Sequence, residues 1–218
     1  MYIFIIVGTI LMCACSIWQS FIKNISVWKA IILSVCFTLF GTLGAFLLYF
    51  VETGSFGGIS FMGSIMLIPI FSIPLKYILK IKYSIIIDIV VPQICLMLFV
   101  MKIHCMIGGC CYGITCYVGD NSFIFPSQIV EGIMSLIFAV VFMLLQYKNI
   151  ANNLLYPIYF IAYGIFRFCF NFLRGGLTPF IGICPAGHFW AILLFITGTI
   201  WLVILLILNK KKGKVKNV

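Results

Sequence analysis

Charged residues are scarce in this sequence, and acidic residues are nearly absent. Of 218 residues only 8% are charged and four are Asp or Glu, whereas 64% are hydrophobic. The mean hydropathy is +1.26. A soluble domain of this composition would have too little polar surface to face water, so the sequence predicts an integral membrane protein.

The short alternating segments of a membrane β-barrel are also missing. The apolar runs are instead about 20 residues long, which is the length of a membrane-spanning helix. Lipid offers no hydrogen-bond partner to an open backbone, so the predicted fold is an all-α, polytopic membrane protein. Seven spans are expected, at approximately 1–21, 30–51, 59–75, 83–101, 123–147, 154–173 and 188–208. They form one transmembrane domain over 1–208, followed by a basic tail over 209–218, with no internal repeat and no room for a separate soluble domain.

The distribution of lysines predicts the orientation. Eleven of the 14 Lys and Arg residues lie in the connections at 23–29, 76–82 and 148–153 or in the tail. With seven spans these segments share one side of the membrane, so the positive-inside rule predicts a cytoplasmic C-terminus and an N-terminus outside. Topology and attraction to anionic lipid then account for the net charge of +10, and no nucleic-acid partner is predicted. Since no Lys or Arg precedes residue 23, we expect the first span to be a retained anchor.

Three cations do not fit this distribution. Lys102 and Arg174 fall at the outer ends of the fourth and sixth spans, and Arg167 falls inside the sixth. A central Arg costs roughly 2.5–3.5 kcal/mol on insertion scales, which makes it a functional candidate. Glu131, in the outer half of the fifth span, is the expected partner of Arg167.

The sixth span carries a polar stripe. Tyr163, Arg167, Asn171 and Arg174 are spaced by four, four and three residues, which places them on one helical face. A lipid-facing helix would not present two guanidinium groups, so we expect the stripe to face a cavity open toward the outer leaflet. Arg suits bidentate phosphate binding. The predicted ligand is therefore an anionic phospholipid headgroup, held by Arg167 with Lys102 or Arg174.

The segment 102–122, predicted to lie outside, is rich in cysteine and glycine. Its cysteines are Cys105, Cys110, Cys111 and Cys116. One or two disulfides are possible there, with the connectivity left open. Zinc is the alternative, but a Cys-x2-Cys pair is missing, and no metal is predicted. Gly108 and Gly109 suit backbone that approaches a ligand closely.

Six short segments follow one another in a recognisable order. They are GGISFMGSIM (57–66), DIVVP (88–92), KIHCMIGGCCYG (102–113), FPSQIVE (125–131), YGIFRFCFNFLR (163–174) and AGH (186–188). In order and spacing they resemble the prolipoprotein diacylglyceryl transferase family over most of the chain. The resemblance implies transfer of a diacylglyceryl group from phosphatidylglycerol to the lipobox cysteine thiol of a prolipoprotein. It also implies a multi-pass protein of the bacterial plasma membrane that needs no cofactor.

The resemblance also implies roles for single residues. Arg167 and Tyr163 fall on family positions regarded as essential, and Lys102 falls on an essential Arg. These cations would stabilise the negative charge that collects on the leaving phosphate. The residues expected to contact substrate are Arg174, Asn171, Glu131, Gln128, Gly108, Gly109, Met62 and His188.

Departures from the family pattern leave the general base open. The family residues are replaced at five positions, Met62, Lys102, Cys105, Cys110 and Asn171. Met62 stands where a His is frequent, so His104 is predicted as the base, with His188 as the alternative, because an unperturbed His has a pKa of about 6.5. Two other functions stay open: an inactive transferase-like protein that binds lipid or a partner, and a small transporter with Arg167, Glu131 and Asp88 as a relay.

Overall fold

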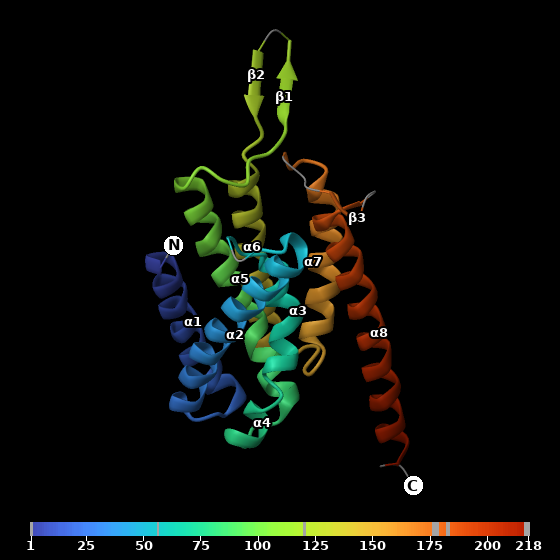
Figure 1. The fold of residues 1–218 in the computed structure, drawn as a ribbon. Helices are drawn as coiled ribbons and strands as arrows, with labels where there is room; N and C mark the ends of the chain where they lie inside the picture. Colours follow the sequence, from blue (N-terminus) through green and yellow to red (C-terminus); the bar gives the residue numbers. More distant parts are fainter. Residues whose placement is uncertain (1, 56, 120, 176–178, 182–183, 216–218) are drawn as a thin grey trace.

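The protein is a helical bundle with two short β-hairpins (Figure 1). The computed structural model describes residues 2–55, 57–119, 121–175, 179–181 and 184–215. The helices are α1 (Tyr2–Lys23), α2 (Val27–Thr53), α3 (Phe61–Phe71), α4 (Leu75–Ile78), α5 (Tyr83–Ile107), α6 (Ser127–Tyr147), α7 (Leu155–Asn171) and α8 (Ala186–Val215). The strands β1 (Thr115–Val118) and β2 (Asn121–Ile124) pair antiparallel, as do β3 (Pro179–Ile181) and β4 (Cys184–Pro185).

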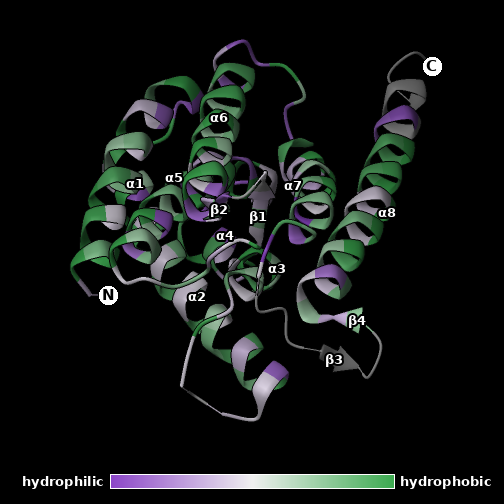
Figure 2. Cartoon of the chain, turned by 90° about the horizontal axis from the view of Figure 1, so that it is seen from above, coloured by the Kyte–Doolittle hydropathy of each residue, from purple (hydrophilic) through white to green (hydrophobic). Residues whose placement is uncertain are grey.

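Five helices of the described chain are long and apolar enough to cross a membrane: α1, α2, α5, α6 and α8. This confirms a polytopic membrane protein, and the helices are mostly hydrophobic along their length (Figure 2). The other two predicted spans correspond to shorter helices, α3 with 11 residues and α7 with 17. The N-terminus lies toward the end of the bundle that carries the β1–β2 hairpin, and α8 ends at the opposite end (Figure 1).

Several predicted boundaries were wrong for local reasons. The span expected at 123–147 begins only at Ser127, because Asn121–Ile124 pairs with β1 instead. The span expected at 59–75 stops at Phe71, and the short helix α4 follows Pro74. Two helices are longer than predicted. Helix α5 continues to Ile107, so the segment predicted to lie outside begins as helix, and α8 continues through much of the predicted tail.

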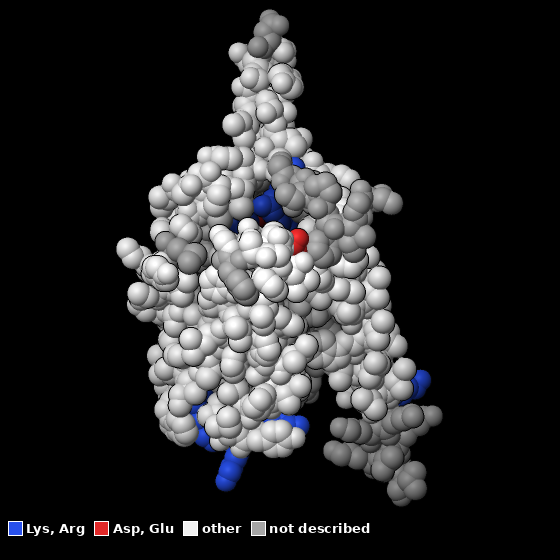
Figure 3. All heavy atoms as spheres, viewed as in Figure 1, with Lys and Arg blue, Asp and Glu red and all other residues white. Residues whose placement is uncertain are grey.

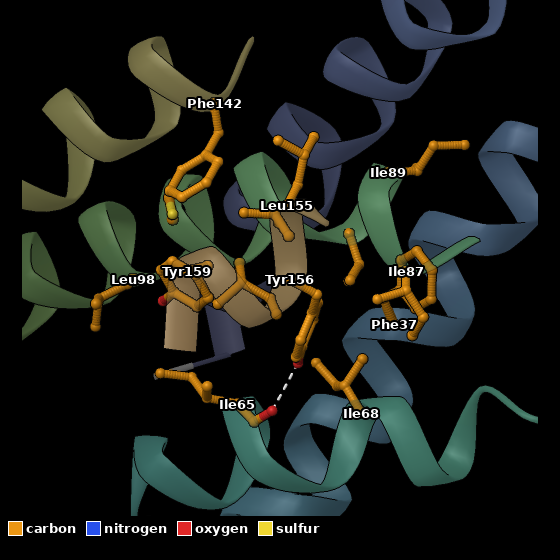
Figure 4. Packing of buried hydrophobic residues seen from close by; sticks show 14 of the residues in the cluster. Phe37, Ile65, Ile68, Ile87, Ile89, Leu98, Phe142, Leu155, Tyr156 and Tyr159 are labelled. Carbon is orange, nitrogen blue, oxygen red and sulfur yellow. Dashed lines mark hydrogen bonds between the residues drawn. The ribbon is translucent and has the colours of Figure 1, made fainter. Parts of the chain in front are cut away.

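Proline inside two helices is compensated by side chains from other helices. Pro69 in α3 has no N–H for the carbonyl of Ile65, and the Tyr156 hydroxyl of α7 donates to that oxygen at 2.6 Å (Figure 4). Pro92 likewise frees the carbonyl of Asp88 in α5, which accepts from Gln146 Nε2 of α6. In lipid a freed backbone group must find a partner inside the protein.

Around these contacts lies the apolar core. Buried side chains from α2, α3, α5, α6 and α7 meet in the middle of the bundle, among them Phe37, Ile65 and Phe142 (Figure 4). Tyr156 and Tyr159 of α7 are fully buried among them. The core therefore fixes α7 against its neighbours below the polar end of the same helix.

A glycine contact brings α2 and α3 together at backbone distance. A Cβ built on Gly63 would lie 2.0 Å from the carbonyl oxygen of Gly44, and one on Gly44 would lie 2.6 Å from that of Gly63. Only glycine at both positions permits this approach. It places the first turn of α3 beside the last turns of α2, at the end of the bundle where polar residues gather.

A group of buried amide side chains lies deeper in the bundle, away from this polar end. Gln19, Gln93 and Gln146 are fully buried and join α1, α5 and α6, because Gln19 Nε2 donates to Gln146 Oε1 and Gln93 Nε2 donates to Gln19 Oε1. Asp88 accepts from the backbone N–H groups of Asn153 and Leu155 and so caps the start of α7. The transporter hypothesis needs Asp88 in a relay, but here that carboxylate is committed to a helix terminus.

Candidate functional site

A polar cavity opens between the helices below the β1–β2 hairpin. Its volume is about 290 Å³. In Figure 3 blue and red atoms are recessed in a hollow there, whereas other cationic side chains lie at the far end. The polar or ionisable residues among those that line it are Tyr49, Glu52, Ser60, Lys102, Cys105, Cys111, Tyr163, Arg167, Asn171, Arg174 and Trp190.

One carboxylate is shared by three cations beside this cavity. Glu131 of α6, whose side chain is 3% exposed, forms ion pairs with Lys102 of α5 and Arg167 of α7. Arg174 Nη1 lies 3.8 Å from Glu131 Oε1. The predicted pair between Arg167 and Glu131 is confirmed, and Lys102 and Arg174 join it.

The charges around Glu131 do not balance. Three cations against one carboxylate leave two positive charges in the cluster, and Glu52, on another part of the cavity lining, accepts from Ser60 Oγ at 3.0 Å. The Nε atoms of Arg167 and Arg174 are buried without a hydrogen-bond partner within the described part of the chain. Since buried donors are normally satisfied, these groups are free to bind an anion that enters the cavity.

The α7 stripe is arranged around the cavity. Tyr163, Arg167 and Asn171 line it from α7, as their spacing predicts. Arg174 also lines it, but the helix ends at Asn171, and Arg174 lies beyond it in a β-bridge with Gly113, so the predicted helical face does not extend to this residue. Asn171 is fully buried, and both polar atoms of its amide are without a partner in the described structure. A Cβ on Gly187 would lie 2.7 Å from the Asn171 amide nitrogen, so a glycine at the start of α8 leaves room for this side chain.

The loop after α5 is tied to the end of α7. The N–H of Gly113 donates to Phe125, that of Ile114 donates to Leu173, and that of Gly175 donates to Tyr112. A Cβ on Gly113 would lie 2.5 Å from the carbonyl oxygen of Phe125, so no larger residue fits there. These bonds fix the backbone on both sides of Arg174 at the edge of the cavity.

Three thiols meet at the same edge. The sulfur atoms of Cys105, Cys110 and Cys111 all lie within 4.8 Å of one another. A hydrogen bond from the Cys105 thiol, together with the positive charges of Lys102 and Arg174, lowers the pKa of the Cys111 thiol although burial opposes this shift. All ten cysteines fall in the described residues and all are free, so no disulfide is formed in the predicted outer segment.

The predicted histidines are not brought to the cavity. His104 stacks on Phe4 of α1 with ring centroids 4.9 Å apart, and His188 packs against Phe168 of α7 and against Phe172, the residue that follows this helix. Neither is among the residues that line the cavity. The sequence-based choice of a base is therefore not supported by position, because both rings pack on aromatic side chains.

The remaining predicted residues take different places. Met62 lines the cavity, but Gly108, Gly109 and Gln128 do not. Gln128 instead supports the thiol loop, since its Nε2 donates to the carbonyl oxygen of Cys110 at 2.7 Å. Glu52, in the last turn of α2, lines the cavity, and so does Tyr49 one turn earlier on the same helix. Tyr49 could not be found from the sequence, because it lies within an apolar run and belongs to no motif.

An apolar cavity adjoins the polar one. It has a volume of about 220 Å³ and lies between α1, α2, α3 and α5. Ile59, Phe61 and Met101 line both cavities, so the polar end of the bundle passes directly into a hydrophobic space. An amphipathic ligand would fit the two adjoining cavities, with its charged head in the polar one and its alkyl tail in the apolar one.

Comparison with known proteins gives one family. Residues 1–204 match the family model of prolipoprotein diacylglyceryl transferase. The chain is 32% identical over 141 residues to the phosphatidylglycerol–prolipoprotein diacylglyceryl transferase 2 of Clostridium perfringens, which covers 58% of this chain and 53% of that protein. It is 28% identical over 125 residues to the phosphatidylglycerol–prolipoprotein diacylglyceryl transferase of Clostridium tetani, covering 51% and 49%. The chain thus spans about half the length of the curated relatives it matches.

Proposed function

The chain belongs to the prolipoprotein diacylglyceryl transferase family, and from this we propose that it transfers a diacylglyceryl group from phosphatidylglycerol to the lipobox cysteine thiol of a prolipoprotein. The observation that carries the proposal is the cluster of Lys102, Arg167 and Arg174 around the single carboxylate of Glu131. Its excess positive charge lies beside an apolar cavity, which is the arrangement that a phospholipid requires.

The reaction is a displacement at carbon. The acceptor sulfur, as a thiolate, attacks the glyceryl carbon next to the phosphate, and a carbon–sulfur bond forms as the carbon–oxygen bond breaks. The electron pair of the broken bond goes to the phosphate oxygen, and glycerol phosphate leaves. Negative charge grows on that oxygen, so fixed cations in a water-poor cavity lower the barrier.

The cations of the cavity, together with Tyr163 and Asn171, have a place in this scheme. Arg167 and Lys102 hold the phosphate, with Arg174 at the edge, and Tyr163 lies one turn below Arg167 at the reacting end. The unpartnered amide of Asn171 offers both a donor and an acceptor to the glycerol headgroup. The acyl chains extend into the cavity shared by Ile59, Phe61 and Met101.

The same proposal includes the topology. We infer seven crossings. The five long helices make five of them, α7 makes the sixth, and α3 together with α4 makes the seventh. The start of α1 then lies outside and the end of α8 lies in the cytoplasm. The polar cavity faces outward, and the Lys-rich connections face the cytoplasm. The protein is thus a single transmembrane domain in the bacterial plasma membrane, with the 209–218 segment on the cytoplasmic side.

The test uses purified protein in vesicles that contain labelled phosphatidylglycerol, with a synthetic lipobox peptide as acceptor. We expect a thioether-linked product, and a rate reduced by about 10²- to 10³-fold in Arg167→Ala, the size seen when one transition-state donor is removed. Arg167→Lys is the matched control, because it keeps the charge but loses the bidentate hydrogen-bond donors of the guanidinium. Its transfer rate should lie between those of the unmodified protein and Arg167→Ala. Lipid binding without any product would instead indicate a transferase-like protein that has lost catalysis.

A further inference from the structure

The three clustered thiols are not used by the proposed reaction. Cys105 and Cys111 line the polar cavity, and Cys110 lies at its exposed edge. Their sulfur atoms lie within 4.8 Å of one another, yet no two are bonded. Three soft ligand atoms at this separation, next to the reacting phosphate position, make up most of a coordination sphere.

The backbone brings the sulfurs together. The N–H of Cys110 donates to the carbonyl of Cys105 at 3.1 Å, which folds the loop back on the last turn of α5. Gly109 has φ of 64° and Cys111 has φ of 61°, a left-handed conformation that a residue with a Cβ rarely adopts. The surrounding structure therefore enforces the turn that points these thiols at one another.

The loop is also anchored from the opposite side by α6. Ser127 Oγ donates to the carbonyl oxygen of Cys111 at 2.5 Å, and Gln128 Nε2 donates to that of Cys110 at 2.7 Å. Because their carbonyls are held in this way, both cysteines have a fixed backbone. Ligands on a fixed backbone lose less conformational freedom when a metal binds.

The surrounding charge suits an anionic complex. Three thiolates and one divalent ion carry a net charge of −1. Lys102 interacts electrostatically with all three thiols, and Arg174 interacts with Cys111. These cations would repel a bare metal ion, but they favour a thiolate-rich complex once it has formed.

We propose that Cys105, Cys110 and Cys111 bind a zinc ion and leave its fourth position open to the cavity, where the acceptor thiol coordinates. Three protein ligands with an open position are typical of catalytic zinc, and thiolates are ligands that zinc favours. This site departs from the sequence-based prediction of no metal, and its role as a thiol activator rests on the proposed function.

The zinc would supply the activation that the chain otherwise lacks. Met62 stands at the cavity where the family often has a histidine, and His104 and His188 pack elsewhere. A thiol that coordinates zinc is deprotonated, and its proton passes to water. The bound sulfur then attacks the glyceryl carbon, the carbon–oxygen bond breaks, and glycerol phosphate leaves with the electron pair. The neutral thioether product, a weak ligand, dissociates.

The test uses Co²⁺ as a spectroscopic substitute for zinc on the full-length protein in detergent. We expect about one Co²⁺ per chain with a thiolate-to-cobalt charge-transfer band. Removing a ligand should weaken binding by more than the roughly 10- to 100-fold typical of outer-shell partners, so Cys111→Ser is the main variant. Cys116→Ser, on β1 and outside the cluster, is the matched control and should bind Co²⁺ as the unmodified chain does.

The acceptor is tested on the same sample. A lipobox peptide should intensify the charge-transfer band by adding a fourth sulfur, and its Cys→Ser analogue should not. Unchanged Co²⁺ binding in the triple Cys→Ser variant, or a disulfide among the three cysteines in freshly isolated membranes, would overturn the site. An unchanged band with peptide would overturn the acceptor role.

The binding readout needs no phosphatidylglycerol and no turnover, so the two proposals can fail separately. Co²⁺ and peptide binding without transfer would remove the transferase proposal and leave the metal site. Undiminished transfer after chelation and in Cys111→Ser would overturn the role of the zinc as thiol activator and leave the transferase proposal intact.

Discussion

The bundle contains two buried polar groups, and they differ in how completely they are satisfied. In the inner group each amide of Gln19, Gln93 and Gln146 has protein partners, and Ser16 and Ser34 are bonded to each other. In the outer group three cations share Glu131, and buried atoms of Arg167, Asn171 and Arg174 have no partner within the described residues. The three glutamines of the inner group are fully buried, and the cationic side chains of the outer group are only 10–16% exposed, so burial alone separates the two groups poorly.

The difference separates structural from functional polarity. A satisfied network in an apolar bundle fixes how the helices pack, and it offers no free hydrogen-bonding group to a ligand. An unsatisfied, charged group costs stability and persists when a ligand completes it. The comparison therefore predicts that changes in the inner group lower stability and that changes in the outer group alter ligand binding and chemistry.

The largest effect is expected from Glu131→Gln, which removes the shared counter-ion of three cations. Loss of one partner from a buried ion pair typically costs about 3–5 kcal/mol, because the remaining charges stay buried. Thermal unfolding in mixed micelles measures this. Phosphatidylglycerol should restore more stability to Glu131→Gln than to the unmodified protein, whereas a zwitterionic lipid should not. Equal rescue by both lipids would mean that the cluster does not bind the anionic headgroup.

Much of the outer group could be predicted from the sequence. Charges are so rare in this chain that Arg167, Lys102 and Arg174 stand out as candidates. The helical spacing of the α7 residues in the stripe predicts which face of that helix lines the cavity. The pairing with Glu131 followed because few carboxylates were available. The ends of α5 and α6 could not be predicted, since they depend on a loop that pairs with itself and with the end of α7.

The inner group could not be predicted in the same way. An isolated Gln such as Gln19 or Gln93 in an apolar run carries no period and no motif, and its partner lies on another helix. The same holds for the donors to carbonyls freed by Pro69 and Pro92, because the sequence marks where a carbonyl is freed but not which side chain reaches it. Similarly, His104 and His188 could be noticed as titratable groups, but their aromatic surroundings arise only from packing.

An intermediate effect is expected from Gln93→Leu, the central member of the inner group. Its loss leaves Gln19 Oε1 without its donor, at a cost of about 1–3 kcal/mol for a buried unsatisfied group, and it also removes the hydrogen bonds of Gln93 to the hydroxyls of Ser16 and Ser34. Chemical or thermal unfolding should show the loss, and the transfer rate per folded molecule should stay within about twofold. A large fall in rate with unchanged stability would contradict the division between the two groups.

The smallest effects come from two tyrosines of α7 that differ in which group they serve. Tyr156→Phe leaves the carbonyl of Ile65 without its donor opposite Pro69, so the protein should lose about 1–2 kcal/mol of stability and keep its transfer rate. Tyr163→Phe removes a hydroxyl that lines the polar cavity, so it should lower the transfer rate with little change in unfolding temperature. The two variants make the same chemical change two turns apart on one helix, which controls for the loss of a hydroxyl as such. If both lowered stability alone, the polar cavity would end above Tyr163, and the phosphate would have to be held by the cations without this hydroxyl.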